Sequence, residues 1–493
     1  MTPTDLDGHD LFNFEDHFFS LTALRGCNPG LVGRIKKNLE AERRFCREHL
    51  APLVLEEDRK HFENPDHLSW EMVRLAGRHG RLSSFIPRLA GGRGDLAVAA
   101  AAPLMEETAS VDTSYAGLLG GHGLGLVALM LTLNLKVLDR VVRKIVKHES
   151  DPKPFLIDCA ITEPAAGTDM EEIDLYPRAR LACHARRVPG GAVLNGRKVF
   201  ISTGHVASEH VVIMPFDRKD PAATGCCFLV PGDARGFSLG RKERKMGQLA
   251  APASELVFED CFVPEDSIVL AGDRFPGSPY QGNYQVLLEN VLGITRTMVG
   301  AISTGTARGA FERSLGLARK LGHRGKTLIN RQWAQALLTD MFITVMSARA
   351  VYMEATFALM TNLNRVLSGD LPSFLNGELA SRVLQTPLSR KFLHAERVKK
   401  YMLKQVLSMP PENNARVQYM SSMAKVVGSD AAMENAHRAV EFFSRAGLRH
   451  DQGLEKIFRD AKLLQIFEGT NQLNRLNVFK HFLGRHLPGV HVF

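Results

Sequence analysis

The segment that decides the fold is GLEKIFRDAKLLQIFEGTNQLNRLNVFKHFLG, residues 453–484. Its apolar residues recur at spacings of three and four on both sides of Gly469, which predicts two amphipathic helices with a break between them. Thr470 or Asn471 can cap the second helix. Glu468 then lies at the carboxyl end of the first helix, where the dipole disfavours a negative charge and apolar neighbours raise the pKa toward that of a general base. The Gly469 N–H can polarise a carbonyl group there. An exposed loop glutamate explains the pattern equally well.

The segment ITEPAAGTD, residues 161–169, predicts a tight loop just before a group of strands. Pro164 and Gly167 set the bend, which places the hydroxyl groups of Thr162 and Thr168 together with backbone N–H groups at one rim. Such a loop suits hydrogen bonding to a planar heterocycle or a phosphate. Taken alone, a turn that only caps a strand is the more frequent explanation.

The segment NGRKVFISTG, residues 195–204, begins with an Asn-Gly pair, which predicts a β-hairpin turn. The strand after it presents Phe200, Ile201 and Ser202 in succession. Taken alone, this segment indicates only a hairpin with a core phenylalanine.

Outward from these segments, the chain divides into three regions. Residues 1–155 space their apolar residues as amphipathic helices do. Residues 156–270 hold short β-branched or aromatic runs separated by Gly or Pro, which predict a small sandwich or barrel. Residues 271–493 begin with a linker at 271–282 and continue with helical patterns, the first of which can form one very long helix. The order predicts an α+β fold with an N-terminal helical domain, a middle β domain and a C-terminal helical region.

Composition narrows the class of protein. Of the 493 residues, 45% are hydrophobic and 23% charged, which is typical of a globular chain. The net charge of +9 favours anionic partners such as phosphates, but does not by itself indicate nucleic acid. Seven cysteines without a CxxC pair, and histidines without metal-ligand spacing, argue against a disulfide framework and a metal site. The first ten residues hold three Asp and no Lys or Arg, unlike a leader peptide, so a cytoplasmic location is expected.

Residues 117–135 form a charge-free run of 19, which is long enough to span a bilayer. Five glycines and His122 within the run favour a buried helix of a large core, with a membrane span as the lesser alternative. The run also lacks the dinucleotide fingerprint, because Leu126 stands where the third glycine is required. Any dinucleotide is therefore bound without a Rossmann loop.

The three quoted segments, in this order and with GRKERKMGQ and SELVFEDCFVPEDSIVL between them, resemble the acyl-CoA dehydrogenase family. The likeness is close over residues 156–312 and 417–484 and loose before them. It implies a helical domain, a middle β domain and a C-terminal four-helix bundle, with FAD bound in a dimer or homotetramer. It also implies that a base takes the α proton of an acyl-CoA thioester while the β hydrogen leaves as hydride to flavin N5. Electrons then pass to an electron-transferring flavoprotein, in fatty acid metabolism.

Carried over position by position, the resemblance makes Glu468 the catalytic base. Some family members place the base on an earlier helix, directly before an Arg. Here Thr295 precedes Arg296, which strengthens the choice of Glu468. The resemblance implies substrate contacts by Thr168, Arg296 and Gly469. It implies FAD contacts by Ile161, Thr162, Gly167, Thr168, Phe200, Ile201, Ser202, Gln332, Thr470 and Gln472.

Two features depart from the family pattern. LGHRGK (321–326) and EFFSRAG (441–447) stand where the family often has glycine-containing stretches that hold the distal half of FAD in a neighbouring subunit. Either that half is held differently, or FAD binding or subunit pairing is weakened. The chain also carries an insertion at about residues 363–415, in which 386–404 has a net charge of +5. That basic segment can bind a membrane surface or a partner, although a solvated helix face is the more frequent explanation.

The leading hypothesis is therefore an FAD-dependent acyl-CoA dehydrogenase that uses Glu468. One alternative is an acyl-CoA oxidase on the same scaffold, which would release hydrogen peroxide. A second is a non-dehydrogenating flavoprotein that binds nucleic acid or membrane. The retained Glu468 argues against the second alternative, because such a protein needs no base there.

Overall fold

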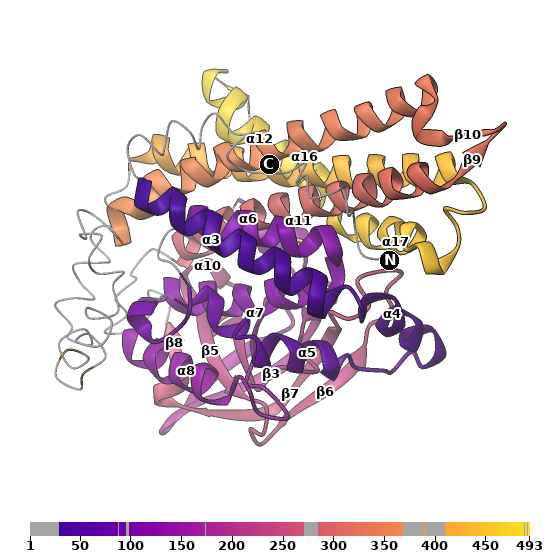
Figure 1. Cartoon of the computed structure of the whole chain (residues 1–493). Helices are drawn as coiled ribbons and strands as arrows, with labels where there is room; N and C mark the ends of the chain where they lie inside the picture. Colours follow the sequence, from indigo (N-terminus) through magenta and orange to yellow (C-terminus); the bar gives the residue numbers. More distant parts are fainter. Residues whose placement is uncertain are drawn as a thin grey trace.

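The computed structural model describes residues 29–86, 88–94, 98–172, 174–270, 284–367 and 410–487, together with 386, 389, 489–490 and 492–493. Figure 1 shows long helices across the top, the strands at the bottom, and the N-terminal helices in front of and between them. The predicted α+β order of helices, strands and helices is confirmed. The predicted linker, and all but two residues of the basic 386–404 segment, lie outside the described residues.

The N-terminal helices pack around α7 (Thr113–Leu131), which contains most of the apolar run noted above. Asp112 caps α7 by accepting hydrogen bonds from the backbone N–H groups of Ser114 and Tyr115. The other described helices of this region, including short turns of π and 3-10 helix, are α3 (Pro29–Phe45), η1 (Cys46–Leu50), α4 (Val54–Glu63), α5 (Trp70–Arg78), η2 (Leu82–Phe85), η3 (Arg88–Ala90), α6 (Val98–Val111) and α8 (Leu135–His148).

By length and composition, α7 and the first thirty residues of α12 (Gln332–Leu367) could each cross a membrane. In the fold, α7 is a core helix, and 67% of its apolar window is buried. His122 is fully buried there, with its ring nitrogens 3.1 Å from Leu82 O and 3.2 Å from Ile157 N. The expectation of a buried helix with a satisfied histidine is thus confirmed for α7.

The middle region consists of two four-stranded sheets that pack face to face. One has the order β1-β4-β5-β8, with β1 parallel to β4 and the other pairs antiparallel; the second has the antiparallel order β2-β3-β7-β6. Buried apolar side chains from both sheets form one core between them. The strands are β1 (Ile157–Ala160), β2 (His184–Val188), β3 (Gly191–Ser202), β4 (Glu209–Pro215), β5 (Gly225–Pro231), β6 (Phe237–Lys242), β7 (Ala253–Pro264) and β8 (Ile268–Leu270). Short helices α9 (Thr168–Glu171), η4 (Tyr176–Arg178), α10 (Pro221–Thr224) and η5 (Glu265–Ser267) connect them.

The predicted hairpin turn at Asn195-Gly196 is wrong, because both residues lie inside β3. The turn comes earlier, at Gly190, whose φ is +82° between the paired ends of β2 and β3. Asn195 and Gly196 instead form an irregularity in the pairing with β7, where Gly196 has φ +127°. The Asn195 side chain exchanges hydrogen bonds with Asp260 at 2.9 and 3.1 Å. Tertiary pairing with β7 has overridden the local turn signal.

The C-terminal region is a helical bundle built on α11 (Tyr284–Lys320), the single long helix that the sequence allows. Figure 1 shows α11, α12 and α16 (Pro411–Phe443) side by side. Small residues permit close packing: a Cβ at Gly300 would lie 2.9 Å from Ala424 of α16. Its remaining elements are β9 (Gly322–His323), β10 (Lys326–Thr327), η6 (Leu328–Asn330), η8 (His450–Gln452), α17 (Leu454–Leu464), α18 (Asn471–Val478), η9 (Phe479–Leu483) and η10 (Gly484–His486).

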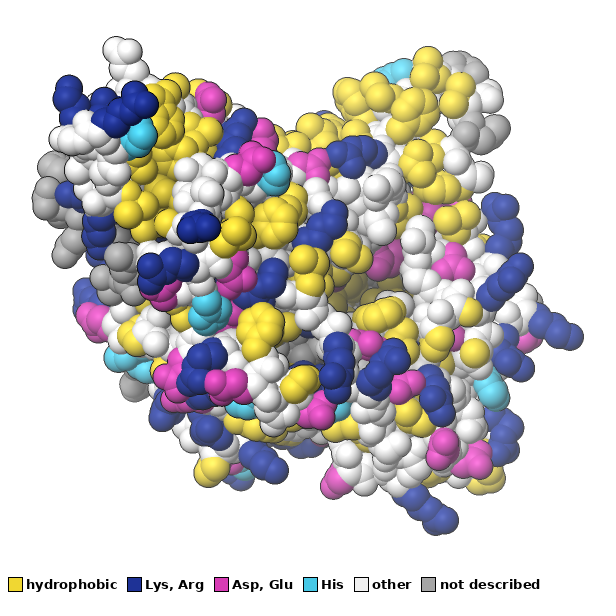
Figure 2. All heavy atoms as spheres, turned by 90° about the vertical axis from the view of Figure 1, so that its right-hand side faces the viewer, with side chains coloured by type: hydrophobic (Ala, Val, Ile, Leu, Met, Phe, Trp, Pro, Cys, Tyr) yellow, Lys and Arg dark blue, Asp and Glu magenta, His cyan; other side chains and the backbone are white. Residues whose placement is uncertain are grey.

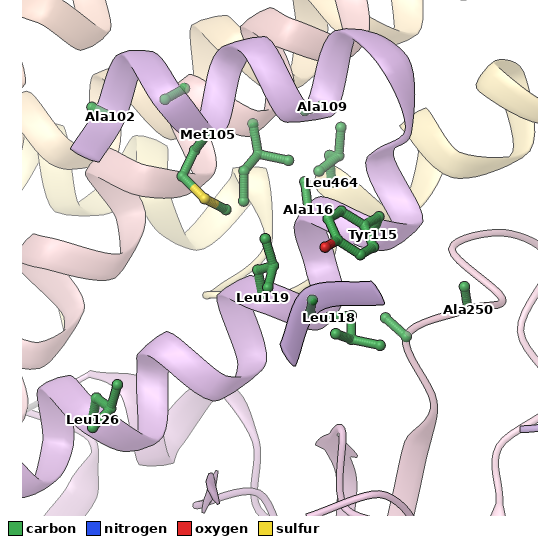
Figure 3. Close-up of a cluster of buried hydrophobic side chains, with 14 of the residues drawn as sticks. Ala102, Met105, Ala109, Tyr115, Ala116, Leu118, Leu119, Leu126, Ala250 and Leu464 are labelled. Atoms are coloured by element: carbon green, nitrogen blue, oxygen red, sulfur yellow. The ribbon is translucent and has the colours of Figure 1, made fainter. Parts of the chain in front are cut away.

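Apolar and ionic contacts tie the bundle to the N-terminal helices. Figure 3 shows the apolar part, where side chains of α6 and α7 meet Leu464 of α17. Beside it, Glu106 of α6 accepts a hydrogen bond from Arg349 of α12, and Arg308 of α11 donates to Glu107 at 2.8 Å. All four of these charged side chains are buried, so each carboxylate is matched by a guanidinium group.

Candidate active site

The predicted break between the last two helices is confirmed, and it holds Glu468. α17 ends at Leu464 and α18 begins at Asn471, so Glu468 lies in the connecting loop rather than on a helix. Glu468 and Gly469 both have left-handed backbone conformations, with φ of +57° and +79°. A left-handed glutamate is strained, which is a feature of functional loops. Thr470 is the N-cap of α18, since its side chain accepts from the Leu473 N–H at 3.2 Å.

Buried polar side chains hold this loop in place. Asn474 Nδ2 donates to the carbonyl oxygens of Glu468 at 3.2 Å and Gly469 at 2.9 Å. Arg296 Nε, from α11, donates to Glu468 O at 3.1 Å. Lys425 Nζ, from α16, donates to Asn471 Oδ1 at 2.7 Å. Backbone carbonyl groups that no helix satisfies are thus bonded by side chains of α18 and α11, while Lys425 of α16 holds the side chain of Asn471.

The Glu468 carboxyl group is half-buried, and Thr295 contacts it directly. Thr295 Oγ1 donates to Glu468 Oε2 across 2.6 Å. Burial raises the pKa of Glu468 above its ordinary range, while the Thr295 hydrogen bond and the charges of Arg296 and Lys425 lower it. Thr295, the residue directly before Arg296, is therefore not a base itself but holds the carboxyl group of Glu468 by a hydrogen bond.

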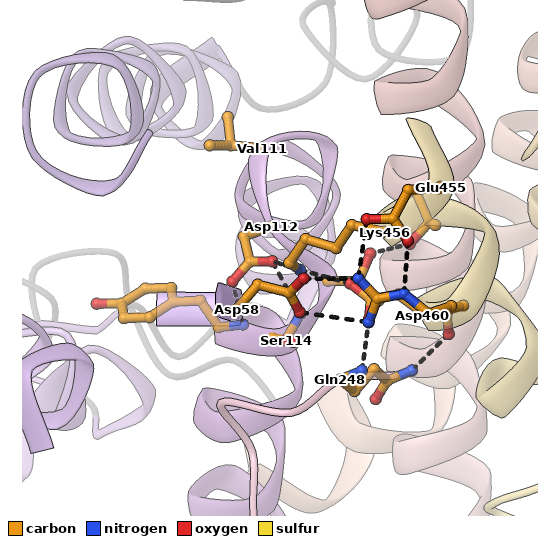
Figure 4. Close-up of polar contacts among 12 residues, drawn as sticks. Asp58, Val111, Asp112, Ser114, Gln248, Glu455, Lys456 and Asp460 are labelled. Atoms are coloured by element: carbon orange, nitrogen blue, oxygen red, sulfur yellow. Dashed lines mark hydrogen bonds and ion pairs between the residues drawn. The ribbon is translucent and has the colours of Figure 1, made fainter. Parts of the chain in front are cut away.

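A buried ionic network fixes α17, which precedes the loop. It consists of Asp58, Asp112, Lys456, Arg459 and Asp460 (Figure 4). Lys456 Nζ donates to Asp112 Oδ1 at 2.5 Å and to Asp460 Oδ2 at 2.6 Å. Arg459 Nη2 donates to Asp58 Oδ2 at 2.6 Å. Since Asp58 lies on α4 and Asp112 caps α7, the network sets the position of α17 against the N-terminal helices.

One group of side chains in this area has metal-like spacing. Ligand atoms of Asp58, His450 and Glu455 lie within 4.8 Å of one another. Arg459 donates to both carboxylates, at 2.6 Å to Asp58 and 2.7 Å to Glu455. A guanidinium group already supplies the positive charge there, so the group is an ion-pair network rather than a metal site.

The ITEPAAGTD loop is anchored by a buried ion pair that sequence reasoning missed. Glu163 accepts from Lys198 Nζ at 2.9 Å and from the N–H groups of Ala182 at 2.7 Å and Cys183 at 2.9 Å. Lys198 Nζ also donates to Ile161 O at 2.7 Å, and both charged side chains are fully buried. The loop is therefore fixed to β3 on one side and to the residues just before β2 on the other. The sequence shows only an acid in the ITEPAAGTD segment and a lysine in NGRKVF, and neither residue by itself indicates the pairing.

Next to this anchor, several predicted FAD-contacting residues lie open at the surface. Thr162 O accepts from the Val199 N–H at 2.9 Å, which brings the loop beside the end of β3. Thr168 and Ser202 are exposed. Phe200 is 60% exposed and has φ +59°, so the prediction of a core phenylalanine is wrong. An exposed ring on a strained backbone beside free hydroxyl groups suits a planar ligand.

The structure brings most of the predicted residues together, but not all of them. α9 begins at Thr168, after Gly167, and its last residue, Glu171, lies 3.9 Å from Arg296, so this loop reaches the Glu468 region. Ile161 and Thr162 adjoin the end of β3, where Ile201 points into the sheet core instead of outward. Two further predicted residues, Gln332 and Gln472, are exposed at the first turns of α12 and α18.

Comparison with known proteins matches this arrangement over most of the chain. The family model described as "Acyl-CoA dehydrogenase, N-terminal domain" matches residues 36–149. The model of the middle domain of that family matches 159–261, and the model of its C-terminal domain matches 284–367 and 379–483. The three models follow one another in the order of the three regions of the fold.

Individual proteins similar to this chain are acyl-CoA dehydrogenases as well. The chain is 28% identical over 392 residues to "Probable acyl-CoA dehydrogenase FadE25" of Mycobacterium tuberculosis, covering 79% of this chain and 82% of that protein. It is 27% identical over 473 residues to cyclohex-1-ene-1-carbonyl-CoA dehydrogenase of Syntrophus aciditrophicus, covering 96% and 95%. An acyl-CoA dehydrogenase from Bacillus anthracis, solved in complex with FAD, has the same fold, with a TM-score of 0.70 at 21% identity over 93% of this chain and 67% of that one.

Proposed function

Because this chain belongs to the acyl-CoA dehydrogenase family, and is accordingly an oxidoreductase, we propose that it introduces a double bond between the α and β carbons of an acyl-CoA thioester. Glu468 is the base in this proposal. The observation that carries it is the Glu468 carboxyl group, which is half-buried, hydrogen-bonded to Thr295 and mounted on a strained loop beside Gly469.

FAD is the cofactor of this proposal, and the open residues around Phe200 fit a flavin. The ring of Phe200 can lie against a planar heterocycle, while the hydroxyl groups of Thr162, Thr168 and Ser202 and nearby backbone groups can hydrogen-bond its polar edge. FAD, when bound, accepts the hydride that leaves the β carbon. The Bacillus anthracis relative of similar fold holds FAD, which supports the assignment.

The residues of this chain handle the proton. Glu468 takes the α proton through a carboxyl group whose pKa is raised by burial, which makes it a stronger base than an exposed glutamate. Thr295 holds one carboxyl oxygen and thereby fixes the direction of the other. In this proposal the Gly469 N–H, directly before the N-cap of α18, polarises the thioester carbonyl, which acidifies the α proton.

In this proposal Arg296 and Thr168 orient the substrate. Arg296 is 1% exposed, and its Nη2 atom has no hydrogen-bond partner among the residues described. A buried guanidinium group with a free donor beside the base can bind an oxygen atom of the CoA thioester. Thr168 is exposed at the beginning of α9 and can contact the substrate from the opposite loop.

The proposal includes a homo-oligomer and an electron-transferring flavoprotein as electron acceptor. Figure 2 shows hydrophobic side chains gathered over the upper part of one face, above a mixture of basic and acidic groups. Among the described residues of the C-terminal region, the exposed large hydrophobic ones are Trp333, Ile343, Leu448, Ile466, Leu476, Phe482, Leu483, Leu487 and Val490. Such a concentration of exposed apolar surface favours a protein–protein contact.

The test is turnover of a panel of acyl-CoA esters with an artificial electron acceptor, by the wild-type protein and by Glu468→Gln. The amide cannot accept the α proton, so we expect turnover to fall at least 1,000-fold, in line with the loss of a general base of this kind. The flavin absorbance of the purified variant should equal that of the wild type. Unchanged turnover would reject Glu468 as the base. Stoichiometric peroxide release under air would favour the oxidase alternative.

A further inference from the structure

A second carboxyl group, that of Glu171, lies next to the Glu468 loop, and the proposed reaction does not use it. Glu171 is the last residue of α9, and its Oε2 atom is buried without a hydrogen-bond partner in the described part of the chain. This oxygen forms a long ion pair of 3.9 Å with Arg296 Nη2, which likewise has no hydrogen-bond partner among the described residues. A Cβ at Gly469 would meet the same oxygen at 3.0 Å. Glu171 is therefore in contact with the base-carrying loop.

Two acids and two cations face one another at this point. Arg296 from α11 and Lys425 from α16 face both Glu171 and Glu468. Burial raises the pKa of Glu171 to about 7, the negative charge of Glu468 contributes to that rise, and the two cations oppose it. Burial likewise lowers the pKa of Lys425 to about 7, against the attraction of Glu171. The charge state of each group thus depends on the others.

The hydrogen bonds distinguish the two acids. Glu468 accepts the Thr295 hydroxyl proton at 2.6 Å, which stabilises its ionised form. Glu171 Oε2 accepts none, so ionisation of Glu171 is the less favourable of the two. The next residue, Glu172, is ion-paired with Lys480 at 2.5 Å. Its negative charge also acts on Arg296, after those of Glu171 and Glu468.

From this geometry we propose that Glu171 is a positioning residue for Glu468. Near neutral pH the two carboxyl groups together carry one proton, which is on Glu171 while Glu468 is ionised. When Glu468 gains a proton, Glu171 loses one to solvent, which its side chain reaches with 18% exposure. The pair then carries one negative charge before and after the transfer, so the balance with Arg296 and Lys425 is kept. The base role of Glu468 rests on the proposed function, whereas the shared proton does not.

The shared proton can be tested without any substrate. Protonated carboxyl groups have a C=O infrared band, which can be followed from pH 5 to pH 9 in the purified wild-type protein and its variants. We expect a band that titrates near pH 7 in the wild type and is absent in Glu171→Gln. In Glu468→Gln the band should titrate at least one pH unit lower, because the neighbouring negative charge is gone. A band in Glu468→Gln that titrates as in the wild type would overturn the proposal.

Turnover provides the second measurement. Ionisation of Glu171 above pH 7 places a negative charge beside Glu468 and makes it a stronger base. The ratio of wild-type to Glu171→Gln kcat/KM should therefore be close to one at pH 6 and rise about threefold or more by pH 8.5. Asp169→Asn, on the same short helix, removes a charge of the same sign and should give a ratio that does not change with pH.

The outcomes separate this proposal from the proposed function. If no acyl-CoA ester is oxidised, the function fails while the infrared titration still decides whether the proton is shared. If turnover occurs and the wild-type to Glu171→Gln ratio is independent of pH, Glu171 has only a structural part and the positioning role is rejected.

Discussion

The buried ion pair between Lys198 and Glu163 allows a prediction whose magnitude follows from its geometry. Lys198→Met removes the ammonium group and leaves the Glu163 carboxylate with no exposed surface and no cation in contact. Removing one partner of a buried pair costs about 3–5 kcal/mol. The two backbone N–H donors of Ala182 and Cys183 remain, so the lower part of this range is expected. The ITEPAAGTD loop would be the first element to loosen, because Ile161 O loses its lysine donor as well.

Hydrogen exchange of the β1 and β3 amides measures this change locally, which avoids assuming that a chain of several domains unfolds in one step. A loss of about 3 kcal/mol corresponds to roughly 150-fold faster exchange through opening. Arg197→Met is the matched control, since its pair with Glu255 is exposed and is worth about 1 kcal/mol at most. The double variant Lys198→Met/Glu163→Gln should recover about 2 kcal/mol, because the charge left unpaired is gone. Less than fivefold acceleration, or no recovery in the double variant, would refute the reasoning.

Two further predictions concern the loop itself. Thr295→Val removes the hydroxyl donor that lowers the pKa of Glu468, so the acid limb of the kcat/KM profile should move about one pH unit upward. The control is Thr297→Val, which loses only a hydrogen bond to a helix carbonyl and should leave the acid limb in place. A limb that stays put in Thr295→Val would contradict this. Gly469→Ala should lower turnover at least tenfold and destabilise by about 1–2 kcal/mol, because φ is +79° and a Cβ meets neighbouring atoms at 3.0 Å. Gly489→Ala shares the positive φ without a close contact, so by thermal unfolding it should show strain alone, with normal turnover.

Sequence patterns predicted those parts of the fold that depend on local periodicity. The continuous helix from Tyr284, the cap at Thr470 and the break that holds Glu468 all follow from apolar spacing and from residue types that end or begin helices. The apolar spacing after the break was only partly informative. Leu473 is buried, whereas Leu476 and Leu483 are exposed.

Other features were out of reach because they depend on contacts between distant segments. Glu163 and Lys198 are 35 residues apart, and nothing in either segment alone indicates that the loop after β1 meets β3 there. In the sequence, Glu171 is one acid of a short acidic run. Only the fold shows that it lies beside Arg296 of α11 and the loop before α18. At Asn195 the strand pairing with β7 outweighed a strong local turn signal. In each case the missing information was tertiary.

The candidate site draws its groups from positions far apart along the chain, which bears on how the protein folds. Thr295 and Glu468 are separated by 173 residues and Glu171 and Arg296 by more than a hundred, so the site closes only when very long loops close. Contacts of such sequence separation form slowly, whereas adjacent strands such as β4 and β5 can pair early. A partly folded chain can therefore contain an ordered middle sheet and no reaction centre. Recovery of catalysis after refolding should accordingly lag behind recovery of secondary structure.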